Sequence, residues 1–177
     1  DTGPYRQSER METSFYKSYV DQLLTDGKAY YCFETAEELE AEKEAAELSG
    51  VAYQYSGKAL SLSPEEIKSK LDLGTSYTVR FHIPENQKVT VPDMIRGDVV
   101  FDSDLLSDFI IQKSDGSPTY NFAVVVDDIT MAISHVIRGE DHLSNTPRQI
   151  LLYEALNAKV PQFAHLPIIL GPDRSKL

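Results

Sequence analysis

The spacing of apolar residues changes twice along this chain, and these two changes constrain its fold more than any other feature. Residues 7–26 carry apolar side chains at helical spacing, which predicts one helix that ends at Gly27. Residues 76–113 contain four short runs that alternate or are wholly apolar, with turn sequences between them, so we expect an antiparallel sheet. Beyond Thr119, strands and helices follow one another, which predicts parallel β/α units and an α/β fold.

Two further helices are marked by their first residues. Thr35 and Glu38 form a capping box that opens an acidic helix ending near Leu48. Residues 63–71 repeat this pattern with a proline at the first helical position, and they predict a second short helix. Residues 29–33 are mostly aromatic and predict a strand ahead of the acidic helix.

The last part of the chain predicts two parallel strands joined by a helix. Residues 133–137 and 163–170 read as the strands, and residues 120–132 suit either a buried helix or a strand. Residues 144–156 predict the connecting helix, with these residues in the core: Ile150, Leu151, Leu152 and Leu156. Ligands of such units bind beyond the carboxyl ends of the strands.

A polar turn follows the strand at 133–137 and is the first candidate site. Arg138 is suited to a carboxylate or phosphate, and Asp141 and His142 are suited to hydroxyl groups or a base edge. We expect Ser144 or Asn145 to cap the next helix, whose N–H groups favour an anion. The alternative is an ion pair between this arginine and an aspartate of the protein, and the spacing favours neither.

The charge balance limits the partners that the chain can bind. A formal net charge of −11 opposes binding to nucleic acid, which requires Lys and Arg. However, residues 1–108 hold 11 Lys and Arg against 21 Asp and Glu, whereas residues 109–177 hold 6 against 7. Much of the acid lies on one solvated helix, so basic patches elsewhere remain available.

Cysteine and histidine usage argues against a metal site. Cys32 is the single cysteine, which excludes an internal disulfide and a zinc knuckle, and we expect a buried, inert thiol. The four histidines fit no zinc-binding spacing, and we expect core or hydrogen-bonded side chains at His82, His135, His142 and His165. No apolar run approaches the roughly 20 residues of a membrane helix, and no signal or transit peptide is visible. We therefore expect no membrane partner and a cytoplasmic or organelle-interior protein.

Four stretches together resemble one enzyme family. They are GPYRQSER (3–10), SDGSPTYNFAVVVDD (114–128), HVIRGEDHLSNTPRQILLYEAL (135–156) and FAHLPIILGPDRSKL (163–177). Their order and spacing resemble bacterial or organellar glutamyl-tRNA synthetase, a class I aminoacyl-tRNA synthetase, over nearly the whole chain. The resemblance implies a Rossmann-like catalytic domain at 1–28 and 118–177, with an α+β acceptor-stem-binding domain inserted at 29–117.

The resemblance also implies site residues. Residues 120–124 correspond to the amino-acid-binding segment, so glutamate would be bound by Tyr120, Asn121, Phe122, Ala123, Val124 and Arg138. Asp141 and His142 would contact the adenylate, Leu166 would offer backbone groups to adenine, and Lys176 would be catalytic as the start of a KLSKR-type signature. From the residues alone, a core aromatic is the favoured interpretation of Tyr120. Asp127 and Asp128 suit a helix end as well as contact with the terminal nucleotide of a tRNA.

The implied activity is ATP-dependent ligation of L-glutamate to tRNA(Glu) through glutamyl-adenylate, with Mg²⁺ and without zinc. The implied partners are glutamate, ATP and the acceptor end of tRNA(Glu), and the implied state is a monomer. The family's HIGH-like motif is missing, and the KLSKR-type signature stops after Leu177. We therefore expect an internal fragment, inactive alone. The alternatives are a non-catalytic acceptor-binding module and the paralogue that glutamylates a modified tRNA base.

Overall fold

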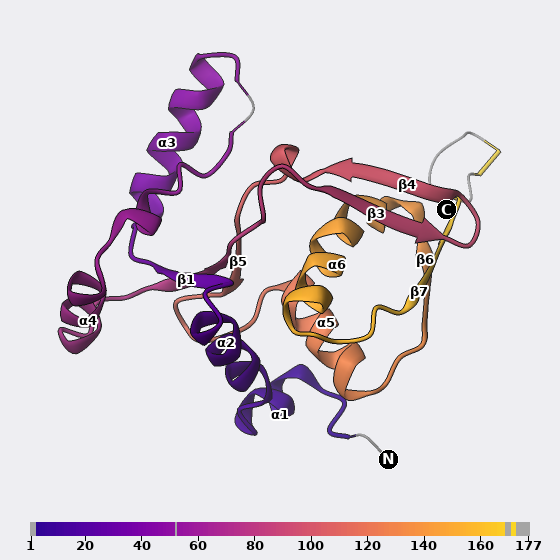
Figure 1. The fold of residues 1–177 in the computed structure, drawn as a ribbon, viewed down its shortest axis with the longest axis horizontal. Coiled ribbons are helices and arrows are strands. Elements are labelled where there is room, and N and C mark those ends of the chain that lie inside the picture. Colours follow the sequence, from indigo (N-terminus) through magenta and orange to yellow (C-terminus); the bar gives the residue numbers. More distant parts are fainter. Residues whose placement is uncertain (1–2, 52, 169–170, 173–177) are drawn as a thin grey trace.

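The computed structural model describes residues 3–51, 53–168 and 171–172 (Figure 1). Its elements in chain order are α1 (Gln7–Glu12), α2 (Phe15–Thr25), β1 (Ala29–Cys32), α3 (Ala36–Leu48), η1 (Lys58–Ser61), α4 (Pro64–Asp72), β2 (Thr78–Phe81), β3 (Lys88–Asp93), β4 (Gly97–Asp102), η2 (Ser103–Leu105), β5 (Phe109–Gln112), α5 (Tyr120–Thr130), β6 (His135–Gly139), η3 (Glu140–Asn145), α6 (Thr146–Ala155) and β7 (Gln162–Leu166). The mixed α/β content confirms the predicted fold class.

The first predicted helix is two helices, so the prediction of one continuous helix is wrong. Ser14 between α1 and α2 adopts a left-handed conformation with φ of 59°, which interrupts the helical hydrogen bonds. The break lets the buried Arg10 guanidinium lie 4.8 Å from the centre of the Phe15 ring. Apolar spacing alone does not reveal such a break.

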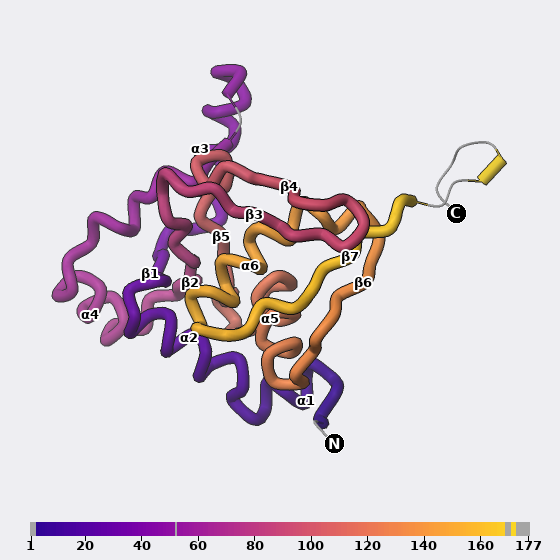
Figure 2. Tube along the Cα trace, turned by 45° about the vertical axis from the view of Figure 1, so that its right-hand side comes forward, coloured from indigo at the N-terminus to yellow at the C-terminus, as the bar shows by residue number. Residues whose placement is uncertain are grey.

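The four strands at 76–113 divide between two sheets, so the prediction of one antiparallel sheet is wrong. One sheet has the antiparallel order β1-β2-β5, and the other has the order β4-β3-β7-β6. The hairpin of β3 and β4 is antiparallel, but β3 also pairs in parallel with β7 (Figure 2). The reason is packing, because Val89 and Val91 on the inward face of β3 belong to the same core as α6 and β7.

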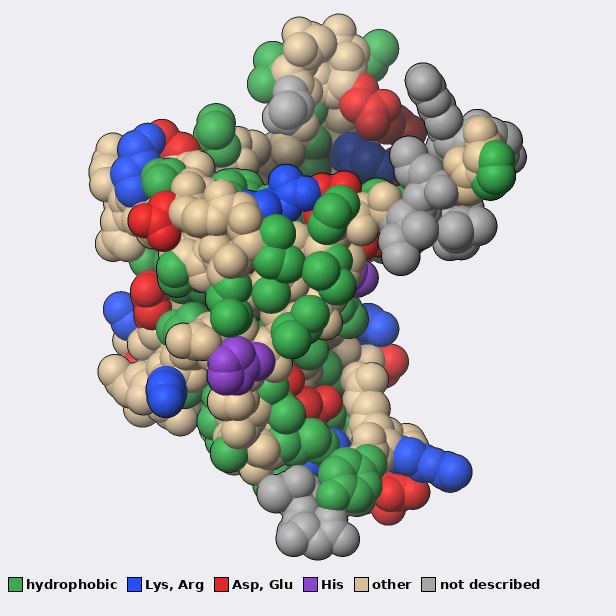
Figure 3. Space-filling model, turned by 90° about the vertical axis from the view of Figure 1, so that its right-hand side faces the viewer, with side chains coloured by type: hydrophobic (Ala, Val, Ile, Leu, Met, Phe, Trp, Pro, Cys, Tyr) green, Lys and Arg blue, Asp and Glu red, His purple; other side chains and the backbone are tan. Residues whose placement is uncertain are grey.

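The predicted parallel unit is confirmed. β6 and β7 pair in parallel, with Arg138 opposite His165 and Gly139 opposite Leu166, and α6 connects them. The segment at 120–132, open between helix and strand, forms helix α5. β6 is an edge strand, and Ile137 on it is 65% exposed. Figure 3 faces this side of the molecule and shows hydrophobic side chains over much of it.

One core joins both sheets, and α3 extends away from it (Figure 1). The buried cluster draws side chains from α2, β1, β2, β3, β5, α5, α6 and β7, whereas α3 contributes no buried residue. Both predicted capping boxes are present, at Thr35 with Glu38 and at Ser63 with Glu66. Within the described residues, no helix is long and apolar enough to span a bilayer.

Candidate active site at the carboxyl ends of two parallel strands

Arg138 lies half-buried at the carboxyl end of β6 and is held by four side chains of the protein. Its Nη2 donates to Gln149 Oε1 at 2.8 Å and to Thr146 Oγ1 at 2.9 Å, and its Nε donates to His165 Nε2 at 3.1 Å. The guanidinium also lies 5.6 Å from the centre of the Phe163 ring. Among the described residues, no carboxylate lies within 4.0 Å of this guanidinium. The alternative of an internal ion pair is therefore not what the structure shows.

A buried pair stands behind this arginine. The side chains of His165 and Asp93 are fully buried, and Nδ1 of the imidazole lies 2.6 Å from Oδ2 of the carboxylate. Because Nε2 of His165 accepts from Arg138, the ring proton must lie on Nδ1 and be donated to Asp93. Although burial opposes ionisation, hydrogen bonds from His165 and from the Arg96 and Ile95 N–H groups lower the pKa of Asp93.

The electrostatic state of Arg138 favours an acidic ligand. Burial lowers the pKa of its guanidinium, and the neighbouring Tyr120 and Asp128 oppose that shift. Burial removes water from the guanidinium, and only neutral acceptors of the described protein take the place of that water. A half-buried cation of this kind is stabilised by a nearby negative charge. A carboxylate arriving from solvent would supply the missing countercharge through a charge-assisted hydrogen bond.

The predicted segment at 120–124 divides into a solvent-facing part and a core part. Tyr120 is 56% exposed, and its ring centre lies 6.1 Å from that of His142. Asn121 accepts a hydrogen bond from Gln149 Nε2 at 2.9 Å, so it connects to Arg138 through one side chain. Phe122 and Ala123 are buried in the main core, where their side chains support α5 from within, and Val124 packs against the same core.

The residues predicted to contact nucleotide lie beside the end of β6. Leu166 at the end of β7 is 46% exposed and pairs with Gly139. His142 in η3 has a buried Nδ1 atom for which the described residues provide no hydrogen-bond partner. Asp141 is exposed, and Lys176 lies outside the described residues. The expected side-chain cap on α6 is wrong, because η3 runs directly into α6 and Asn145 itself has helical geometry.

Asp127 and Asp128 both have partners inside the protein. Asp127 Oδ1 lies 2.7 Å from Nε of the buried Arg10 and accepts from Tyr16 OH at 2.8 Å. Burial, followed by the hydrogen bond to Asp127, raises the pKa of Tyr16 to about 12. Asp128 accepts from Tyr153 OH at 2.8 Å, and burial raises its pKa. Through these contacts Asp127 joins α5 to α1 and α2, and Asp128 joins α5 to α6.

Sequence reasoning missed the polar residues that surround Arg138. Asp93, Thr146 and Gln149 are all buried, although only the first carries a charge. The signal for Asp93 is the alternation of β3, in which it shares the inward face with Val89 and Val91. His165 was expected to be a core or hydrogen-bonded histidine, and this is confirmed.

The predicted buried state of Cys32 is confirmed, and its partners are side chains. Cys32 Sγ donates to Glu34 Oε2 at 2.8 Å, and Tyr55 OH donates to Glu34 Oε1 at 2.8 Å. The Arg80 guanidinium lies 3.9 Å from the centre of the Tyr55 ring. Across the part of the chain that the structure describes, no group of three His, Cys, Asp or Glu side chains could hold a metal ion.

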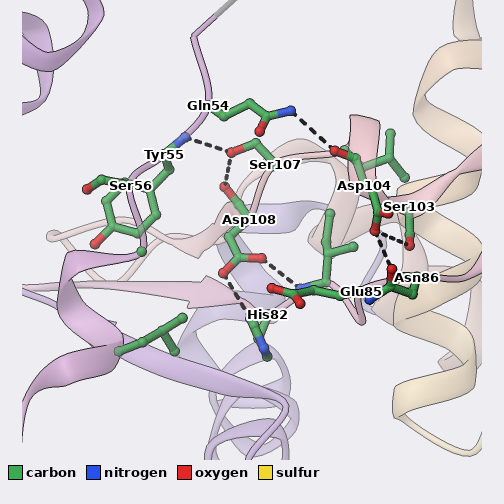
Figure 4. A pocket seen from close by; sticks show the side chains of 14 residues that line it. Gln54, Tyr55, Ser56, His82, Glu85, Asn86, Ser103, Asp104, Ser107 and Asp108 are labelled. Carbon is green, nitrogen blue, oxygen red and sulfur yellow. Dashed lines mark hydrogen bonds and ion pairs between the residues drawn. The ribbon is translucent and has the colours of Figure 1, made fainter.

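A separate cavity of about 420 Å³ lies in the segment predicted to be an inserted domain (Figure 4). Asp108 is one of its lining residues, and its carboxylate lies 3.0 Å from His82 Nδ1 and accepts from the Ile83 N–H at 2.8 Å and from Tyr30 OH at 2.7 Å. Glu85 and Asp104 also line it, and none of the described lining residues is Lys or Arg. Such a lining repels phosphates and carboxylates, so the candidate site for an acidic ligand remains at Arg138.

Comparisons with known proteins identify the family of this chain. A family model described as tRNA synthetases class I (E and Q), catalytic domain, matches residues 1–177. The glutamate–tRNA ligases of Carboxydothermus hydrogenoformans and Aquifex aeolicus are 52% identical over 177 residues and 56% identical over 173 residues. These alignments cover 100% and 98% of this chain but 36% of each relative, so the chain spans about a third of their length.

Solved structures show the same fold. The glutamate-tRNA synthetase of Elizabethkingia anophelis matches with a TM-score of 0.92 and 39% identity, covering 100% of this chain and 37% of its own. The fold is thus that of a class I aminoacyl-tRNA synthetase catalytic domain. Within that class, the chain belongs to the tRNA synthetase family for glutamate and glutamine, E and Q.

Proposed function

We propose that this chain is part of an enzyme that ligates L-glutamate to tRNA(Glu) at the expense of ATP. The observation that supports this most directly is the Arg138 guanidinium, half-buried at the strand ends and held by neutral acceptors in the described protein. Curated relatives that align with at least 98% of this chain carry the name glutamate–tRNA ligase, which favours this activity over that of the paralogue that modifies a tRNA base.

The reaction requires positioning rather than a nucleophile from the protein. The glutamate α-carboxylate attacks the α-phosphorus of ATP, which forms glutamyl-adenylate and releases pyrophosphate. A ribose hydroxyl of the tRNA then attacks the acyl carbon, so that the acyl–phosphate bond breaks and AMP leaves. Mg²⁺, bound with ATP, offsets phosphate charge, and the protein holds the reacting groups in line. This chemistry accounts for a site built from an arginine, a tyrosine and hydrogen-bonding groups.

In this proposal each predicted residue has a physical role. Arg138 binds the described residues through Nε and Nη2, and in this proposal Nη1 pairs with a glutamate carboxylate. Tyr120 and Asn121 flank that position from the start of α5. Asp141, His142 and the backbone of Leu166 contact the nucleotide, and Lys176 would meet its phosphates. Phe122, Ala123 and Val124 act through the packing of α5.

Two variants of Arg138 in the full-length protein test the proposal. Arg138→Ala should raise KM for glutamate about 100-fold, because a charge-assisted pair is lost. Arg138→Lys keeps the charge without the planar fork and should raise it about tenfold. Both should leave KM for ATP within about threefold. Stability should fall by about 1–3 kcal/mol in Arg138→Ala, because buried acceptors lose their donor.

Arg148 offers a matched control for these variants. It is also half-buried and also has a pKa lowered by burial, but it lies on α6 and donates to the Ser144 carbonyl at 3.4 Å. Arg148→Ala should leave KM for glutamate unchanged. If Arg138→Ala changed glutamate use no more than Arg148→Ala does, the proposed role of Arg138 would be refuted. The 177 residues alone should form no glutamyl-tRNA, and product formation would favour a shorter catalytic unit.

A further inference from the structure

A continuous hydrogen-bonded array runs from the β3–β4 hairpin to Arg138. At its buried end, Asp93 Oδ1 accepts from the N–H groups of Ile95 and Arg96, each at 3.0 Å. Asp93 Oδ2 accepts from both the main-chain N–H of His165 at 3.0 Å and its ring. The ring then presents Nε2 to Arg138. Asp93 is thus fixed from two elements, and its carboxylate holds the ring in one place.

This array controls which tautomer His165 can adopt. The carboxylate of Asp93 can only accept, so it keeps the ring proton on Nδ1 and leaves Nε2 as an acceptor. The opposite tautomer would put an N–H at Nε2, where among the described residues only Thr146 Oγ1 at 3.1 Å could accept it, and Arg138 Nε–H would lose its acceptor. The guanidinium would then turn away, since Thr146 and Gln149 hold only its Nη2 side.

We propose that Asp93 and His165 are positioning residues that orient the Arg138 guanidinium toward the glutamate carboxylate. This inference rests on the proposed function of Arg138 and adds two residues from β3 and β7 to it. Two observations carry it: the complete burial of both side chains, and a hydrogen-bonded array in which Nδ1 of His165 faces a carboxylate that can only accept while Nε2 accepts from Arg138. Gln149 completes the arrangement, since its amide accepts from Arg138 and donates to Asn121.

Two substitutions of His165 separate positioning from packing. In His165→Gln the amide oxygen can occupy the place of Nε2 and accept from Arg138, but the bond to Asp93 is lost. In His165→Asn the amide N–H can replace Nδ1 and donate to Asp93, but Arg138 loses its acceptor. Each variant therefore breaks one bond of the buried array, and a purely structural role predicts that the more destabilised variant is also the less active.

Full-length enzyme carrying each variant is assayed for KM of glutamate, KM of ATP and Tm. Positioning predicts a rise in KM for glutamate of about tenfold or more in His165→Asn, a rise below about threefold in His165→Gln, and KM for ATP unchanged in both. As a single variant, Asp93→Asn should raise KM for glutamate. Added to His165→Gln, it should cause no further rise, because Asp93 acts through the imidazole ring of His165.

Equal effects of the two His165 variants, or effects that follow Tm, would overturn the proposal. Arg138→Ala in the same assay distinguishes failure of the positioning role from failure of the proposed function. If Arg138→Ala raises KM for glutamate but His165→Asn does not, the positioning role fails and the proposed function stands. If Arg138→Ala has no effect, the proposed function fails, and the positioning role fails with it.

Discussion

Gly139 is the last residue of β6, and the Asp141 carboxylate lies against it. A Cβ atom at residue 139 would lie 2.5 Å from Asp141 Oδ1, although the backbone itself, at φ of −65° and ψ of 149°, suits any residue. Gly139→Ala should therefore displace the carboxylate while changing the stability by less than about 1 kcal/mol. If Asp141 contacts the nucleotide as predicted, KM for ATP should rise severalfold while KM for glutamate stays constant.

Asp141→Ala is the reference for that measurement. If the glycine acts only by making room for the carboxylate, the double variant should have the KM for ATP of Asp141→Ala alone, because the two changes remove the same interaction. An additive rise in the double variant would mean that Gly139 contributes in another way, for example through its own backbone contact with the nucleotide.

Single residues also show where prediction from sequence succeeds and where it stops. Arg138 was placed at a strand end by the order of strand, turn and helix, and Leu166 was placed on the neighbouring strand. Gln149 was not found, because a polar residue inside an apolar helix pattern has no recognisable partner until the fold brings Arg138 beside it. Long-range hydrogen bonds of this kind depend on tertiary structure and leave no periodic signal.

At the scale of elements, an ion pair joins α1 to α5. Asp127→Ala would leave the Arg10 guanidinium, whose side chain is 1% exposed, without its carboxylate. We expect the free energy of unfolding to fall by about 3 kcal/mol, measured by urea denaturation. Glu9→Ala breaks the exposed pair with Arg6, which is 4.0 Å long, and should have no measurable effect. A stable Asp127→Ala variant that had lost only tRNA charging would instead favour contact with the tRNA.

Element boundaries were predictable where local chemistry sets them. Both capping boxes fix a helix start through bonds between residues three apart, and the structure shows them as expected. The sequence does not reveal the break at Ser14, because that break accompanies the contact of Arg10 with Asp127 on a distant helix. It does not reveal the pairing of β3 with β7 either, because the partner strand lies about 70 residues away. Period-two alternation predicts a strand without saying which sheet it joins.

At the scale of the whole molecule, the two sheets share one core, and Asp93 lies where β3 meets β7. The pKa of Asp93 is lowered in the folded state, so its ionised form stabilises the protein at any pH above the unfolded value of about 3.9. That stabilisation is lost as the pH falls through the lower, folded value. Because the core is shared, we expect both sheets to unfold together in one acid transition.

Thermal unfolding measured between pH 7 and pH 2 tests this expectation. Asp93→Asn should lower Tm at pH 7 and flatten the slope below pH 4, where one proton contributes at most about 1.4 kcal/mol per pH unit. Asp102→Asn is the matched control, because Lys88 lowers the pKa of Asp102 in an ion pair at the exposed surface of the hairpin. That control should keep the wild-type slope, since water screens the exposed pair. If Asp93→Asn kept the same acid slope as wild type, protonation of this buried carboxylate would not contribute to the loss of stability in acid.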